Sequence, residues 1–159
     1  MVDAKDIQHL TLFQGLAADE LKAVTSIVSS EVYEKGQTVF EEGQCDCPCI
    51  YIVQKGRVDV AKRNKDGDFL TLSVLREESF FGEMSFLDGK PHSATITTAT
   101  DAAVVLKIDR KDFDSFVLGH PQTGYKILFN IVHEIIHLVR KMNSQYIDLA
   151  GYMFGRTKR

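Results

Sequence analysis

The sequence has no tryptophan, three prolines and three cysteines in 159 residues. The cysteines are crowded into Cys45–Cys49, and an odd number so close together does not make a disulfide framework. No apolar run approaches the roughly 20 residues of a membrane-spanning helix. The first ten residues hold two aspartates and lack the apolar centre of a secretory signal. We therefore expect a reduced, cytoplasmic protein.

The chain also lacks an excess of positive charge. Its 19 Lys and Arg against 22 Asp and Glu give a formal net charge of −3. Nucleic-acid-binding domains usually carry a basic surface, so we expect neither direct nucleic-acid binding nor a membrane partner. With 44% hydrophobic residues, residues 1–159 are long enough to form a single domain with its own core.

Residue patterns divide the chain into three parts. Residues 1–31 predict a short amphipathic helix at about 17–29. Residues 32–108 contain short β-type runs between glycine-bearing turns, with a hairpin signal at Asp66-Gly67. Many short strands at even spacing predict a barrel or a double-sheet roll. The runs are Thr38–Phe40, Ile50–Val53, Arg57–Lys62, Phe69–Leu75, Ala94–Thr98 and Val104–Ile108.

Residues 109–159 predict a hinge and a long helix. Asp109 is placed to cap a short helix that Gly119 ends, and His120-Pro121 opens the long one. Apolar residues then alternate steps of four and three, which favours a parallel homodimer through a coiled-coil seam. The alternative is one wide apolar face buried within the chain. The predicted seam is Leu128, Val132, Ile135, Val139, Met142, Tyr146 and Leu149.

The segment Phe81–Ala94 (FGEMSFLDGKPHSA) has the features of an anion site. Gly82 allows a close approach of backbone to a ligand, and the short turn after it would present free N–H groups. Glu83 would repel a phosphate, so its carboxylate makes sense only as an acceptor of hydrogen bonds, for example from a ribose hydroxyl.

This segment resembles the phosphate-binding cassette of cyclic-nucleotide-binding domains, as in catabolite activator/FNR-type regulators and in cyclic-nucleotide-dependent kinases and channels. The resemblance covers nearly the whole chain and implies an α+β fold. That fold is an antiparallel, jelly-roll-like β-roll with a short N-terminal helix and a long C-terminal dimerisation helix. It also implies a cyclic nucleotide, cAMP or cGMP, as ligand, with no cofactor and no catalysis.

The resemblance further implies roles for individual residues. Glu83 would bind the ribose 2′-hydroxyl, while Gly82, Met84 and Ser93 would meet the cyclic phosphate. The long helix would cover the base through Leu138 and Val139. The complete set of ligand-binding residues expected in this way is Leu72, Ser73, Phe81, Gly82, Glu83, Met84, His92 and Ser93.

The cassette departs from the family at His92, where an arginine usually follows the proline. Arginine supplies a permanent charge and a bidentate fork, whereas histidine is mostly neutral at pH 7. A hydrogen bond to a charged group contributes roughly 1.5–3 kcal/mol, so affinity would fall on the order of 10- to 100-fold. The family's Gly-Asp before the cassette is Glu78-Ser79 here, and one residue is inserted around Cys45–Cys49.

Two other motifs suggest metal sites. His133-Glu134-Ile135-Ile136-His137 matches the H-E-x-x-H zinc motif, but the expected third ligand does not follow, and the heptad frame puts both histidines on the solvated face. Cys45, Cys47 and Cys49 could hold a soft metal but lack an obvious fourth ligand. We expect no metal site and no enzymatic activity.

Three functions remain open from sequence. The first is a dimeric, non-catalytic sensor domain that binds a cyclic nucleotide, weakly because of His92. The second is the sensor part of a catabolite-activator-like regulator without its helix-turn-helix domain. The third is a ligand-free dimeric interaction module.

Overall fold

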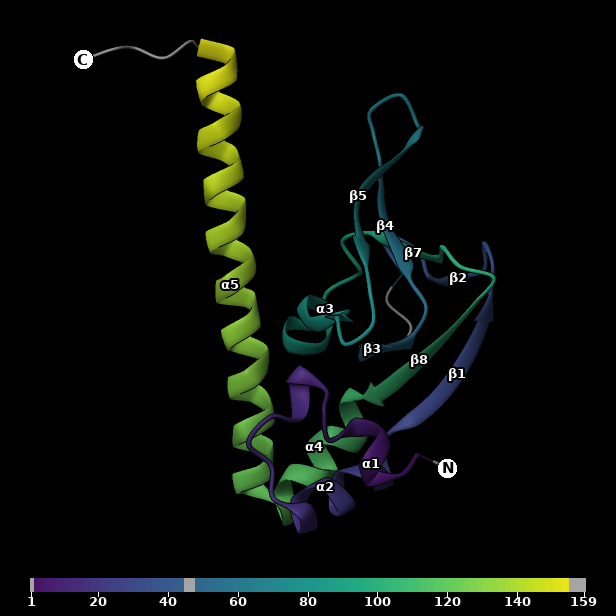
Figure 1. Ribbon diagram of the computed structural model, residues 1–159, viewed down its shortest axis with the longest axis vertical. Helices are drawn as coiled ribbons and strands as arrows, with labels where there is room; N and C mark the ends of the chain where they lie inside the picture. Colours follow the sequence, from purple (N-terminus) through teal and green to yellow (C-terminus); the bar gives the residue numbers. More distant parts are fainter. Residues whose placement is uncertain (1, 45–47, 155–159) are drawn as a thin grey trace, which may run out of the picture.

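Two four-stranded antiparallel sheets form a β-roll, and one long helix runs beside it (Figure 1). The computed structural model describes residues 2–44 and 48–154. Short helices gather at the end of the roll where the long helix begins, and the hairpin of β4 (Val58–Arg63) and β5 (Phe69–Leu75) extends at the other end. The fold class predicted from sequence is confirmed.

Strand pairing builds each sheet from segments far apart in the chain. The first sheet has the order β1 (Ser29–Glu34), β8 (Ala102–Asp109), β3 (Cys49–Lys55) and β6 (Phe80–Phe81). The second has the order β2 (Thr38–Phe40), β7 (Thr95–Thr98), β4 (Val58–Arg63) and β5 (Phe69–Leu75). The hairpin predicted at Asp66-Gly67 joins β4 to β5, with Gly67 in the left-handed region at φ 90°.

Strand β3 is buried on both faces and separates two apolar cores. Because successive side chains of a strand point to opposite sides, Tyr51 and Val53 pack inside the roll with Phe81 and Val105. Ile52 packs on the other side, in a core shared with the helices. The roll therefore keeps a fixed position against the helical layer.

The helical layer consists of six helical elements. These are α1 (Ala4–Ile7), η1 (Thr11–Phe13), α2 (Ala18–Val24), η2 (Thr25–Ile27), α4 (Arg110–Gly119) and α5 (Pro121–Phe154). As predicted, the side chain of Asp109 accepts a hydrogen bond from the Lys111 N–H at the start of α4, and α5 begins at Pro121.

Polar contacts hold the first half of α5 against the N-terminal segment. The Asn130 side-chain amide donates to the carbonyls of Leu12 and Gln14, at 3.0 Å each. Lys126 Nζ lies 2.6 Å from a Glu20 carboxylate oxygen, and this hydrogen bond lowers the pKa of Glu20. These contacts fix the first half of α5 to the N-terminal segment of the same chain.

The sequence predictions fail mainly at the N-terminal side. The helix predicted at about 17–29 is wrong at its end, because α2 stops at Val24, a single 3-10 turn follows, and Ser29 already pairs with Lys107 in β1. Strands β1 and β6 were not predicted. In β1 (SSEVYE) every residue is exposed or half-buried and the apolar Val32 is exposed, and β6 is only two residues long, so neither has the alternation that predicts a strand.

The residues of the predicted seam divide into two groups. Leu128 and Ile135 are partly buried against the core of their own chain. The other five have exposed side chains. They are Val132, Val139, Met142, Tyr146 and Leu149.

Glu78, in the connection from β5 to β6, has a left-handed backbone with φ 72°. Its N–H donates to the carbonyl of Val53 at 2.9 Å, and the Val53 N–H donates back to Ser79. Since a left-handed residue with a Cβ costs about 1–2 kcal/mol, this position has a backbone conformation that favours glycine.

We predict that Glu78→Gly raises the free energy of unfolding by about 0.5–1 kcal/mol, the left-handed cost less the extra entropy of glycine. Urea denaturation of both proteins measures this. The matched control is Glu77→Gly, which removes the carboxylate that accepts from the Gly56 N–H and should destabilise. Equal destabilisation by both changes would contradict the account.

Candidate ligand-binding site

The cassette begins with a backbone turn that only glycine accommodates. Gly82 has φ 80°, and a Cβ there would lie 2.6 Å from the Cys49 carbonyl oxygen and 3.0 Å from the Tyr51 ring. The turn is thus pressed onto β3. Helix α3 (Glu83–Asp88) follows directly and ends at Gly89, whose φ is 69°.

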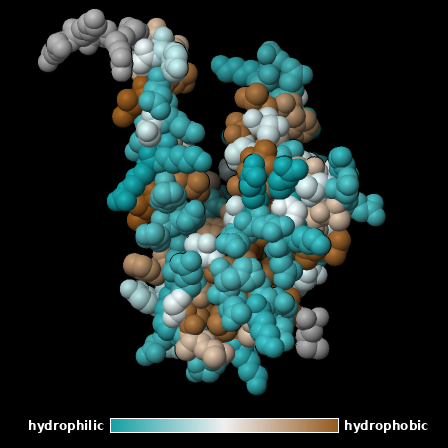
Figure 2. Space-filling view, viewed as in Figure 1, coloured by the Kyte–Doolittle hydropathy of each residue, from teal (hydrophilic) through white to brown (hydrophobic). Residues whose placement is uncertain are grey.

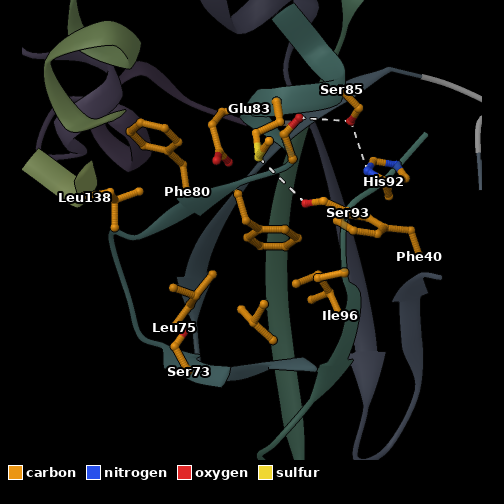
Figure 3. A pocket seen from close by; sticks show the side chains of 15 residues that line it. Phe40, Ser73, Leu75, Phe80, Glu83, Ser85, His92, Ser93, Ile96 and Leu138 are labelled. Atoms are coloured by element: carbon orange, nitrogen blue, oxygen red, sulfur yellow. Dashed lines mark hydrogen bonds between the residues drawn. The ribbon is translucent and has the colours of Figure 1, made fainter. Parts of the chain in front are cut away.

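A cavity of about 190 Å³ lies between the cassette, the second sheet and α5 (Figure 3). The cassette supplies one wall, β4, β5 and β7 supply the opposite one, and Leu138 of α5 lies at the edge. The lining residues are Phe40, Val60, Ser73, Leu75, Phe80, Phe81, Gly82, Glu83, Met84, Ser85, His92, Ser93, Ala94, Ile96 and Leu138.

Most residues expected from sequence lie at this cavity, and two do not. Ser73, Phe81, Gly82, Glu83, Met84, His92 and Ser93 line it, as does Leu138. Leu72 is 56% exposed and absent from the lining; it lies at an irregularity of the register, where Ser73 pairs with Val60 and Thr71 with Ala61. Val139, one residue beyond Leu138, is also exposed and outside the lining.

Sequence reasoning missed much of the apolar wall. In the second sheet Val60 pairs with Ser73 on one side and with Ile96 on the other, so these three side chains stand in a row. Strand alternation from Ser73 would have found Val60, Leu75 and Ile96 once the pairing was known. Phe40, from the short strand β2, had no such signal.

The imidazole of His92 is held within the protein. Its ring stacks on Phe40 with centroids 3.6 Å apart and planes 10° from parallel. Nδ1 lies 2.9 Å from the Ser85 hydroxyl, whose oxygen is 3.2 Å from the Gly82 carbonyl. Only 8% of the residue is exposed, and this burial lowers the pKa of His92 from its ordinary 6.5. The neutral ring is favoured.

Among the described residues that line the cavity, Glu83 is the one carboxylate. It is half-buried, and desolvation raises the pKa of its side chain. The cavity lining, drawn from the described ranges 2–44 and 48–154, contains neither lysine nor arginine. The site can therefore accept hydrogen bonds from hydroxyls at Glu83 and enclose an apolar ring, but an anion would meet no permanent positive charge.

The two metal motifs do not form a cluster in the part of the chain described. His133 and His137 are exposed on α5, and residues 2–44 and 48–154 contain no group of three or more possible metal ligands. Cys49 is fully buried; Cys45 and Cys47 lie outside the described residues. Within the same ranges, no helix is long and apolar enough to cross a membrane.

The family model described as "cyclic nucleotide-binding domain" matches residues 30–120, which is more than half of the chain. The chain belongs to the cyclic nucleotide-binding domain family. This domain is 28% identical over 138 residues to a CRP-like cAMP-activated global transcriptional regulator of Mycobacterium tuberculosis, covering 87% of the chain. It spans only 59% of that regulator's length.

Solved structures of the family agree with the fold. The catabolite activator protein of Thermus thermophilus superposes with a TM-score of 0.75 and 26% identity, over 88% of this chain and 63% of that one. The regulatory domain of Toxoplasma gondii PKA, crystallised with cAMP, gives a TM-score of 0.62 and 26% identity. That match covers 71% of this domain and 42% of the other chain.

The lowered pKa of His92 predicts a specific pH dependence of stability. Above pH 6.5 the ring is neutral in both folded and unfolded chains. As the pH falls through 6.5 the unfolded chain takes up a proton before the folded one, so stability is lost. We expect the free energy of unfolding of wild type, relative to His92→Gln, to fall between pH 7.5 and 5.5. Parallel pH profiles would contradict a neutral buried His92.

Proposed function

We propose that this chain is a non-catalytic sensor domain that binds a cyclic nucleotide, cAMP or cGMP, in the cavity beside the cassette. The supporting observation is that Glu83, Ser93 and the Gly82 turn line one cavity in a member of this family. The Toxoplasma relative was crystallised with cAMP. An apolar wall across from the cassette suits a flat base, and Leu138, which lines the same cavity, is the residue that we expect to close over it.

Binding is expected to be weak, in the micromolar range, because His92 brings no permanent charge. A bound phosphate would favour the imidazolium and raise its pKa, so that binding takes up a proton. Affinity should then increase from pH 7.5 to pH 6.0. The stacked, hydrogen-bonded ring must also give up part of its contact with Ser85 or Phe40 to reach a phosphate, which weakens binding further.

A signal would leave the cassette through Arg110. This side chain of α4 donates to the Phe86 carbonyl and pairs with Asp114 at 2.8 Å. Phe86 of α3 meets Phe113 of α4 edge-on at 5.4 Å. These contacts bind the end of α3 to α4, so a ligand that repositions the cassette would also reposition α4 and α5. The ligand achieves this only by binding one arrangement more tightly than the other.

The output would be a change at a homodimer formed through α5. Exposed apolar side chains occur among hydrophilic ones on the upper part of α5 and on the β4–β5 hairpin (Figure 2), and a second chain packed on α5 would remove those of the helix from water.

We predict that His92→Arg binds cAMP at least tenfold more tightly, since a charged hydrogen bond to phosphate is restored. Isothermal titration calorimetry with cAMP and cGMP, at pH 7.5 and 6.0, measures this for wild type and variant. His137→Arg adds the same charge on the exposed face of α5 and should leave affinity unchanged. Unaltered affinity in His92→Arg would contradict the placement of His92 beside the phosphate.

We predict that Glu83→Gln has opposite effects on stability and on ligand binding. Loss of the buried charge should raise the free energy of unfolding at pH 8, and this gain should shrink as the pH falls toward 4.5. Loss of the carboxylate acceptor should weaken cAMP binding on the order of 10- to 100-fold. Thermal unfolding and calorimetry of the same preparations measure both effects. A variant that binds as tightly as wild type would remove Glu83 from the site.

Absence of heat with either nucleotide, together with an unshifted melting temperature at millimolar nucleotide, would overturn the sensor proposal. It would favour the ligand-free interaction module, in which the His92–Ser85 contact is a permanent part of the fold.

A further inference from the structure

The hydrogen bond between Ser85 and His92 is buried at the wall of the cassette cavity (Figure 3). Ser85 is 5% exposed and His92 is 8% exposed. The Ser85 hydroxyl oxygen has two polar neighbours, Nδ1 of His92 at 2.9 Å and the carbonyl oxygen of Gly82 at 3.2 Å. A serine hydroxyl carries a single proton, so only one of these two contacts can use it.

The Gly82 carbonyl fixes the direction of both hydrogen bonds. A carbonyl oxygen only accepts, so the Ser85 proton must point to Gly82 for that contact to be a hydrogen bond. The Ser85 oxygen then accepts from the Nδ1–H group of His92. In the opposite arrangement two oxygen atoms would face each other without a proton between them, and one hydrogen bond would be lost. The neutral imidazole therefore carries its proton on Nδ1 and donates it to Ser85.

The main chain of His92 is held on both sides. Its N–H donates to the Gln44 carbonyl at 3.0 Å, and its carbonyl accepts from the Gly43 N–H at 2.8 Å. The ring can therefore reach a bound phosphate only by rotating about its side-chain bonds. Such a rotation gives up the hydrogen bond to Ser85 together with the stack on Phe40, whose ring centroid lies 3.6 Å away.

A phosphate oxygen and the Ser85 oxygen are both acceptors, so they compete for the same imidazole N–H. We propose that Ser85 is a positioning residue that restrains phosphate binding, because its hydroxyl takes the place of a ligand phosphate at His92. The inference rests on the cyclic-nucleotide binding proposed above and names the autoinhibitory contact that regulates it. A ligand with a phosphate must displace Ser85 from His92, whereas a ligand without one leaves the pair intact.

Replacement of Ser85 by alanine tests this competition. Ser85→Ala removes the competing acceptor and should tighten cAMP binding about three- to tenfold, because the ligand no longer has to replace a hydrogen bond. The Gly82 carbonyl keeps its bond from the Phe86 N–H at 3.0 Å, so the turn itself is retained. Adenosine has the base and the ribose but no phosphate, and its affinity should not change. Isothermal titration calorimetry at pH 7.5 measures both ligands.

Two protein controls assign the effect to the imidazole. In a His92→Phe background the aromatic ring is kept but has no N–H to release, so adding Ser85→Ala should change cAMP affinity by less than about twofold. Ser26→Ala removes a hydroxyl that likewise donates to a carbonyl three residues earlier, that of Ala23 at 2.7 Å, and should leave affinity unchanged. Circular dichroism checks that each variant is folded.

Nitrogen-15 NMR of the imidazole tests the contact without any ligand. In wild type at pH 7.5 the proton of His92 should reside on Nδ1, and in Ser85→Ala it should be shared with Nε2. The exposed rings of His133 and His137 give the reference signals. A wild-type His92 with its proton on Nε2 would overturn the inference.

The outcomes of the titrations separate this inference from the proposed function. Tighter cAMP binding by Ser85→Ala, absent for adenosine and in the His92→Phe background, supports the competition even where wild type gives no heat. If wild type binds cAMP, then unchanged or weaker binding by Ser85→Ala, or an equal gain for adenosine, overturns the competition and leaves the sensor standing. Absence of cAMP binding by wild type, Ser85→Ala and His92→Arg overturns both.

Discussion

The contact of Gly82 with strand β3 is the constraint on which the rest of this domain depends. Because Gly82 lacks a Cβ and adopts a left-handed backbone, the cassette turn rests directly on the Cys49 carbonyl and the Tyr51 ring. Phe81 is thereby buried inside the roll and stacks on Tyr51 at 5.2 Å. Helix α3 starts from this fixed point, so Glu83 is held at the cavity beside it.

The chemistry of the cavity then follows from which charges are present. In the cassette that this one resembles, an arginine would meet the phosphate. Here His92 occupies that position, and its buried imidazole hydrogen-bonds to Ser85 and stacks on Phe40. Burial raises the pKa of Glu83 and lowers that of His92. Both shifts favour the neutral side chains. A phosphate bound beside His92 would have to raise the pKa of the imidazole again for it to be held as the imidazolium. Weak, proton-linked binding is what we propose for this site on these grounds.

Sequence reasoning succeeded where a local signal was strong. Strands with alternating or fully apolar residues, the Asp109 cap, the Pro121 start of α5 and the cassette motif all have such signals. It failed where position depends on pairing across the sheets. Leu72 and Ser73 are neighbours in sequence, but only the register of β5 with β4 shows that Ser73 faces the cavity. In the same way, the heptad pattern of α5 could not show which of its apolar residues pack against the core of their own chain. The structure shows that Leu128 and Ile135 do so.

The most direct test of the central idea, that the cassette cavity is the ligand site, is a two-dimensional NMR titration of the amide-labelled chain with cAMP. The account predicts that the amide signals of Gly82, Glu83, Ser85 and Ser93 shift together, with one shared saturation curve, while those of the β4–β5 hairpin tip stay in place. Shifts confined to other parts of the chain, or no shifts at millimolar cAMP, would contradict it.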